Sequence, residues 1–124
     1  MKDFRRLKVW EKAHHLTLDI YKATTNFPRA ELYGLTSQMR RCSASMGANI
    51  AEGCGKQGNN ELHRFLHIAS GSASELDYQL LLARDLNYMT DEEYRRIDGR
   101  LLELRRMLTA LIQKVGADRF AANC

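Results

Sequence analysis

The sequence predicts an all-α protein, an up-down-up-down antiparallel four-helix bundle formed by residues 1–124 as a single domain. Three observations lead to this prediction. Apolar residues recur at steps of three and four in four separate segments, which is the spacing of one helix face. The chain has 44% hydrophobic residues and a single proline, a composition that favours packed helices. The breaks between segments are short, and short connections make successive helices antiparallel neighbours.

The first helix is predicted over residues 9–25. It should end before Pro28, because the residue that precedes a proline disfavours helical geometry. The arm before it, with Phe4 and Leu7, should fold back on the bundle. The stripe expected to face the core consists of Trp10, Ala13, Thr17, Ile20 and Thr24.

The second helix is predicted over residues 30–53, with an interruption near Gly34 and a left-handed cap at Gly53. Cys54 should then lie in a glycine-rich loop. Small side chains occupy many positions between the core residues, so a neighbouring backbone could approach closely. The expected core face consists of Leu32, Leu35, Met39, Cys42, Met46, Ile50 and Gly53.

The third and fourth helices are predicted over residues 59–87 and 91–115, each with an apolar seam at heptad spacing. Thr90 and Glu93 form a capping box before the fourth helix, and residues 116–124 are expected to be a frayed tail. An extra apolar flank on the fourth helix favours a contact between subunits. This flank consists of Leu102, Met107 and Ile112.

Four polar residues are interpreted as structural ties between helices: Arg40, Asn49, Glu52 and Glu75. Buried polar groups need hydrogen-bond partners, and such partners hold the register of two helices. Antiparallel geometry should bring Arg40 within reach of Ser72 or Glu75.

No catalytic residue, cofactor or metal site is predicted. The glycines of Gly53-x-Gly55-x-x-Gly58 match a dinucleotide-binding pattern, but they follow a helix instead of a strand. A di-iron bundle needs two Glu-x-x-His pairs and the chain has one, while His63 and His67 share a face without a third ligand nearby. Three cysteines without metal-type spacing fit a reducing compartment. With no apolar run of about 20 residues and no signal peptide, we expect a cytoplasmic protein without a membrane partner.

The formal charge is +4, and the basic residues gather in two clusters that could attract phosphates. Neighbouring carboxylates such as Glu103 offer the alternative interpretation, a solvated surface of paired charges. The candidate nucleic-acid-binding residues are Arg95, Arg96, Arg100, Arg105 and Arg106, followed by Lys2, Arg5 and Arg6.

A set of motifs also points to a family. They are Arg40-Arg41-x-x-x-Ser45-x-x-x-Asn49-Ile50-Ala51-Glu52-Gly53, Trp10-x-x-Ala13, Phe27-Pro28-x-x-Glu31 and Ile68-Ala69-x-Gly71-Ser72-x-x-Glu75-Leu76. Across nearly the whole chain the sequence resembles the four-helix bundle proteins encoded in intervening sequences of bacterial 23S ribosomal RNA. The resemblance implies a ring-shaped homopentamer. It also implies kinship with the accessory variability determinant of diversity-generating retroelements, whose basic rings engage a reverse transcriptase and nucleic acid.

Two functions remain open at this point. The first is a non-enzymatic, homo-oligomeric protein that binds RNA or DNA electrostatically or acts as an accessory factor. The alternative is a protein-interaction scaffold with no nucleic-acid role, in which the arginines pair with local carboxylates. An enzyme would require a concave pocket with titratable groups around Asn49, Glu52 and His63.

Overall fold

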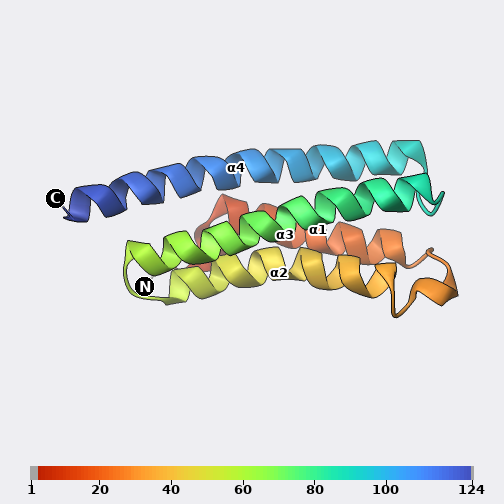
Figure 1. The fold of residues 1–124 in the computed structure, drawn as a ribbon, viewed down its shortest axis with the longest axis horizontal. Helices are drawn as coiled ribbons and strands as arrows, with labels where there is room; N and C mark the ends of the chain where they lie inside the picture. Colours follow the sequence, from red (N-terminus) through yellow and green to blue (C-terminus); the bar gives the residue numbers. More distant parts are fainter. Residues whose placement is uncertain (1–2, 124) are drawn as a thin grey trace.

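A computed structural model describes the backbone of residues 3–123 and the side chains of residues 3–117. The four long helices are α1 (Lys8–Thr24), α2 (Leu35–Gly55), α3 (Asn59–Asp85) and α4 (Asp91–Asn123). Two 3-10 turns, η1 (Phe4–Arg6) and η2 (Arg29–Glu31), precede α1 and α2. The described backbone contains no strand, and the helices run up, down, up and down (Figure 1), as predicted.

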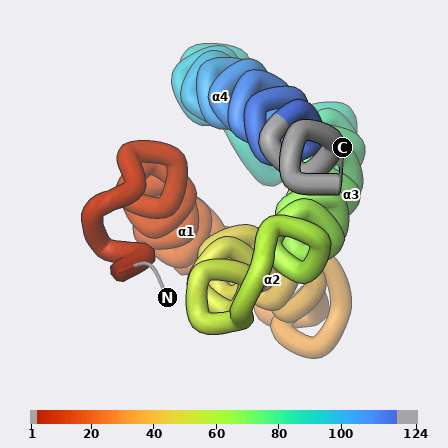
Figure 2. Tube along the Cα trace, turned by 90° about the vertical axis from the view of Figure 1, so that its left-hand side faces the viewer, coloured from red at the N-terminus to blue at the C-terminus, as the bar shows by residue number. Residues whose placement is uncertain are grey.

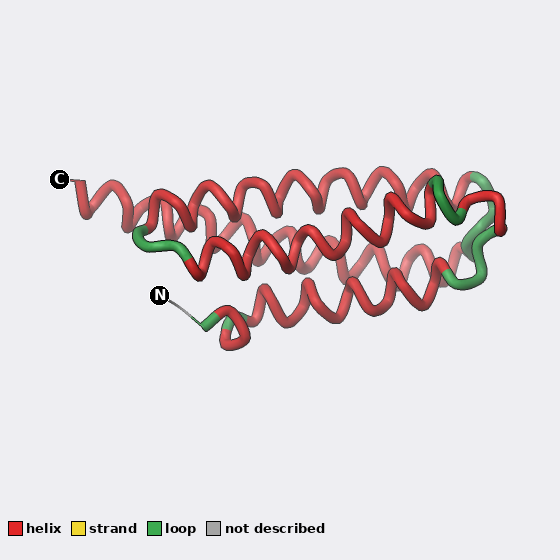
Figure 3. Tube along the Cα trace, turned by 90° about the horizontal axis from the view of Figure 1, so that it is seen from below, coloured by secondary structure: helices red, strands yellow, loops and turns green. Residues whose placement is uncertain are grey.

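Each helix packs against its neighbours in the chain, and α1 closes the bundle against α4. The view along the bundle places the four helices in that cyclic order (Figure 2). The α1–α2 and α3–α4 connections lie at one end and the α2–α3 connection at the other (Figure 3). The α1–α4 contact is the least extensive of the four. Among the described residues, no helix is long and apolar enough to cross a membrane.

The core contains side chains from all four helices, and the predicted seams account for most of it. An exception is Leu32, which remains 47% exposed because it lies in the turn before α2. The largest fully buried side chains are Leu16, Ile20, Met39, Met46, Ile50, Leu66, Leu76, Leu80, Ile97, Leu101, Leu104 and Leu108.

The start of α2 differs from the predicted residue 30. The chain makes the turn η2 and then begins α2 after Gly34, where the interruption was expected. Glu31 Oε1 accepts a hydrogen bond from the Leu35 backbone N–H at 3.2 Å. This bond satisfies one of the free donors of the first helical turn.

The end of α2 corrects the interpretation of its glycines. The helix continues through Gly53 to Gly55, and Gly58 is the glycine with a positive φ, 87°. A Cβ added at Gly53 would lie 2.9 Å from Phe65 Cβ, so this glycine allows α2 and α3 to approach closely. Cys54 is consequently a buried helical residue instead of a loop residue.

The helix α4 also extends beyond its predicted end at residue 115. It continues to Asn123 and reaches past the start of α3 (Figure 1), so the expected frayed tail is wrong for the backbone. No proline interrupts residues 116–123, and alanines at 117, 121 and 122 are strong helix formers. Of the predicted extra flank, Leu102 is 47% exposed, whereas Met107 and Ile112 pack partly against the core.

Candidate functional site

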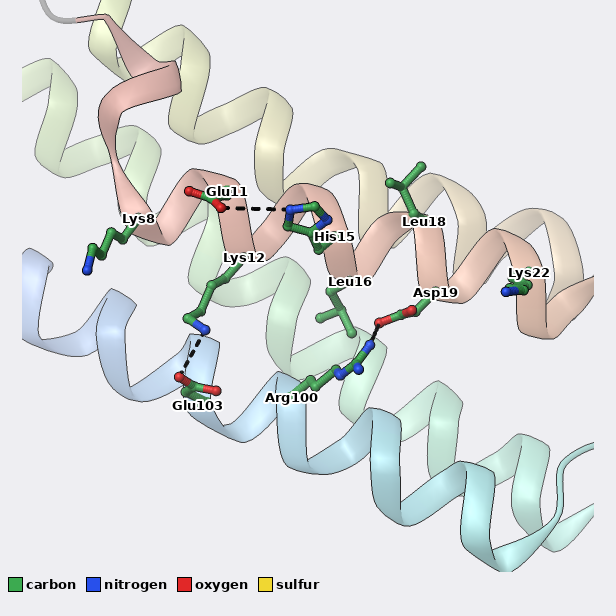
Figure 4. Close-up of a pocket in the computed structure, with 10 residues that line it drawn as sticks. All are labelled: Lys8, Glu11, Lys12, His15, Leu16, Leu18, Asp19, Lys22, Arg100 and Glu103. Atoms are coloured by element: carbon green, nitrogen blue, oxygen red, sulfur yellow. Dashed lines mark hydrogen bonds and ion pairs between the residues drawn. The ribbon is translucent and has the colours of Figure 1, made fainter.

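A groove of about 700 Å³ follows the α1–α4 seam, where the two helices pack least closely (Figure 4). Seven of its ten lining residues are charged, and the buried Leu16 forms part of its floor. The lining residues are Lys8, Glu11, Lys12, His15, Leu16, Leu18, Asp19, Lys22, Arg100 and Glu103.

Ion pairs cross this groove. Lys12 Nζ lies 3.1 Å from Glu103 Oε1, and Arg100 donates to Asp19 Oδ2. Arg96 Nη1 approaches the other oxygen of Asp19 at 3.9 Å. The Asp19 side chain is only 18% exposed, so two guanidinium groups share a partly buried carboxylate. These pairs compensate most of the charge in the middle of the groove, with three cations against two carboxylates.

The ends of the groove keep positive charge. Lys8 and Lys22 lie at opposite ends in Figure 4, both exposed. Neither makes an ion pair with another described residue.

The five α4 arginines point in three directions instead of forming one surface. Arg96 and Arg100 face α1, whereas Arg105 faces α3 and donates to Asp77 Oδ2 at 2.9 Å and to Ser74 Oγ at 3.1 Å. Arg95 and Arg106 are exposed and make no ion pair within the described part of the chain. Arg95 and Arg106 are eleven residues apart, which is about three turns of an α-helix. Their side chains therefore lie on the same outer face of α4.

The N-terminal cluster lies on η1. Arg5 Nη1 is 3.5 Å from Asp3 Oδ1, and its guanidinium lies over the Phe4 ring at 4.5 Å. Arg6 is exposed and has no ion-pair partner among the described residues. Lys2, the third residue predicted here, lies outside the described residues.

An aromatic row, Phe4, Trp10, His14 and His15, begins beside these arginines. Phe4 meets Trp10 edge to face at 4.9 Å, and the His14 ring stacks on Trp10 at 5.1 Å with an interplanar angle of 5°. The His15 ring follows at 5.9 Å. This row was not predicted from the sequence, although the four-residue spacing of Trp10 and His14 indicates their contact.

A carboxyl pair joins α3 to α4. Burial, a hydrogen bond to Asp77 and the Asp77 charge raise the pKa of Asp98, while Arg105 and Arg84 act in the opposite direction. Asp77 also accepts a hydrogen bond from Arg105, so this one carboxylate interacts with both the Arg105 guanidinium and the Asp98 carboxyl group. This pair was not predicted from the sequence, because its members are 21 residues apart on different helices.

Arg40 joins α2 to α1, not to α3. Its Nε donates to Thr24 Oγ1 at 2.8 Å, its Nη2 donates to the Tyr21 carbonyl at 3.2 Å, and its guanidinium lies 4.8 Å from the Tyr21 ring centre. The expected reach to Ser72 or Glu75 is therefore wrong. The helical rotation of residue 40 turns its side chain toward the end of α1.

The other three expected ties also differ in detail. Asn49 donates within α2 to the Ser45 carbonyl at 2.8 Å and to Ser45 Oγ at 3.0 Å; Ser45 Oγ in turn pairs with Ser72 Oγ of α3 at 3.0 Å. Asn49 is therefore linked to α3 only indirectly, through the hydrogen bond between Ser45 and Ser72. Glu52 is exposed and makes no hydrogen bond or ion pair with another described residue, so the expected tie is not formed, although Arg64 of α3 lies close enough for an electrostatic interaction.

Glu75 is exposed but contacts α2 through a thiol. Cys42 Sγ donates to the Ser72 carbonyl at 3.0 Å and to Glu75 Oε2 at 3.6 Å. Burial, followed by the Glu75 charge, raises the pKa of Cys42 to about 12. A thiol of such high pKa stays protonated and unreactive at neutral pH.

His63 and His67 lie beside a second hollow of about 640 Å³ on α3, with ring centres 4.5 Å apart. Within the described residues, no group of three or more histidines, cysteines or carboxylates could hold a metal ion.

The fold and these sites define an antiparallel four-helix bundle with a charged seam. The model of the 23S rRNA-intervening sequence protein family matches residues 5–110, and the chain belongs to this family. A solved structure from Bacteroides thetaiotaomicron, described as a protein of unknown function from the S23 ribosomal protein family, has a similar fold with a TM-score of 0.76. It is 29% identical, and the match covers 84% of this chain and 97% of that one. No curated protein matches this chain.

Proposed function

We propose that this is a non-enzymatic, homo-oligomeric accessory protein of the cytoplasm that binds nucleic acid electrostatically. The observation that carries the proposal is a set of exposed cations without a carboxylate partner among the described residues, spread over α1, α4 and the arm before α1. They are Arg6, Lys8, Lys22, Arg95, Arg106 and Lys114, and Arg29 and Arg41 are further exposed cations of this kind in η2 and α2. The family's description supports a link to ribosomal RNA genes.

Unpaired cations are the ones that matter for this function. Binding gains free energy when a protein cation replaces the counterions condensed on a phosphate. Arg100 and Arg105 already have carboxylate partners, so a phosphate would have to compete with Asp19 or Asp77. We therefore assign the α4 contribution to Arg95 and Arg106 and not to all five arginines.

The proposal includes self-association, with the ring of five that the family resemblance implies. One chain has a modest charge of +4, but a ring would repeat each unpaired cation. Exposed small and apolar residues support such contacts: Ala44 and Ala48 face outward on α2, and Leu102 is 47% exposed on α4.

The test compares two variants with equal loss of formal charge. Arg95→Gln/Arg106→Gln removes two unpaired arginines, and Arg100→Gln/Arg105→Gln removes two paired ones. Affinity for a labelled RNA and for a DNA duplex is measured by fluorescence anisotropy over a range of salt, and oligomer mass by light scattering. The first variant should show weaker binding and a salt slope that is smaller by roughly 0.7–0.9 per lost phosphate contact. The second should keep the wild-type slope.

A second candidate is the protein-interaction scaffold, which the pairing of Arg96, Arg100 and Arg105 with Asp19 and Asp77 favours. If the oligomer does not bind nucleic acid at any salt concentration, the result would contradict electrostatic binding and support the scaffold. Capture of a defined protein partner would then be the next measurement.

A further inference from the structure

We propose that the aromatic row at the start of α1 binds an unpaired base of single-stranded nucleic acid, with the arginines of η1 contacting the adjacent phosphates. This inference rests on the proposed function and names both the site and the form of nucleic acid. The base would stack on the His14 ring, which itself stacks on Trp10.

The row is a supported platform. Trp10 is half-buried and lies against α2: a Cβ added at Gly47 would be 3.5 Å from its Nε1. Phe4 contacts Trp10 from the side at 4.9 Å, and His14, which is exposed, lies nearly parallel to the indole. The α2 helix and η1 hold the indole in place, so the His14 ring is oriented before any ligand arrives. Pre-orientation lowers the entropy lost on binding.

Positive charge borders the platform. The Arg5 side chain is 70% exposed over Phe4, and Arg6 is exposed on the same turn. Lys8 and Lys12 continue along α1, although Lys12 is paired with Glu103. Of the carboxylates in this region, Asp3 pairs with Arg5, and Glu11 lies 3.9 Å from His15 Nε2, a contact that is an ion pair only when the imidazole is protonated. Stacking rings beside cations are the combination that binds single strands without sequence preference.

Base stacking and electrostatic attraction predict opposite preferences between single-stranded and double-stranded nucleic acid. A duplex has the higher charge density and would bind better if charge alone acted. Its bases are stacked on each other, however, and only a single strand can offer a free base to a ring. A preference for single strands at matched length and salt would therefore identify stacking.

The experiment uses the chain's single tryptophan as a local probe. The full-length protein is titrated with a 12-mer of uridine and with a 12-base-pair RNA duplex, following both Trp10 emission and the anisotropy of labelled oligomers. The variant is His14→Ala. The matched control is Tyr78→Ala, which removes another exposed aromatic ring, on α3 and outside the row.

We expect the single strand to bind more tightly than the duplex and to quench Trp10 emission. His14→Ala should weaken single-strand affinity about tenfold and leave duplex affinity unchanged, because one base–ring stack is lost. Tyr78→Ala should match the wild type.

Two results would overturn the inference, and they differ in what else they overturn. Binding with unchanged Trp10 emission and equal affinity in His14→Ala would reject the platform but leave electrostatic binding intact. Absence of binding to either oligomer, even at low salt, would reject both this inference and the proposed function.

Discussion

At the scale of single residues, two glycines in similar helical settings have opposite roles. Gly53 is buried where α2 meets α3, and an added Cβ would lie 2.9 Å from Phe65 Cβ and 3.1 Å from Leu62 Cδ1. Gly71 is exposed in α3, with no atom within 4 Å of such a Cβ. Only the first is required by packing, because glycine in an open helix costs stability without a compensating contact.

The two alanine substitutions should therefore change stability in opposite directions. Gly53→Ala should lower the free energy of unfolding by about 1–3 kcal/mol, the usual effect of overpacking. Gly71→Ala should raise it by about 0.5–1 kcal/mol, since alanine restricts the unfolded chain and favours helix. Urea denaturation of both variants checks this prediction. Equal stability of Gly53→Ala and the wild type would show that α2 and α3 can separate at no cost.

At the scale of elements, the pairs of helices are joined by different chemistry. Apolar side chains dominate the centre of the bundle, whereas ion pairs cross the outer edge of the α1–α4 seam and a carboxyl pair lies between α3 and α4. Exposed ion pairs contribute little and weaken with salt. The α3–α4 carboxyl pair is unfavourable when both groups are ionised, which makes that junction sensitive to pH.

Asp98→Asn should reveal this sensitivity. The folded chain raises the pKa of Asp98, so the folded state holds a proton more strongly than the unfolded state, and stability falls as pH rises through the folded pKa. The asparagine variant avoids this loss. It should unfold at a higher temperature than the wild type at pH 7, and the difference should disappear at a pH below the pKa of an ordinary aspartate.

Circular dichroism melts at a series of pH values measure the effect. Glu52→Gln is the control, because Glu52 is exposed and makes no ion pair with a described residue. A difference between Asp98→Asn and wild type that stayed constant from pH 3 to pH 8 would contradict the assignment to Asp98.

At the scale of the whole molecule, one bundle leaves an outer face of α2 uncovered. Ala44 and Ala48 are exposed there, beside an α1 face on which Leu18 is 52% exposed and Tyr21 45% exposed. Small residues allow close approach of a second helix, so this face is where we expect copies of the chain to meet.

Ala48→Glu tests this expectation, because glutamate favours helix but places a charge on the face. The oligomer mass from light scattering should fall while helicity is retained. Ala30→Glu places the same charge on another exposed alanine, in η2, and should leave the mass unchanged. Unchanged mass in both variants would place the subunit contact elsewhere.

The number, order and direction of the helices could be predicted from the sequence, because apolar periodicity and short connections are local properties. The same periodicity identified Ile20, Met39, Met46 and Ile50 as core residues. Boundaries were less predictable: Gly53 looked like a cap because glycine commonly ends helices, and only its contact with Phe65 shows why it is buried.

The partners of the polar residues were decided by the tertiary structure. The position of a residue in the sequence determines the direction of its side chain around its own helix. The group that the side chain contacts, however, depends on the offset and rotation of the neighbouring helix. For this reason Arg40 reaches Thr24 instead of Ser72, and Asp98 meets Asp77. The sequence alone determined a basic four-helix bundle; packing decided which of its cations remain unpaired and where aromatic rings gather beside them.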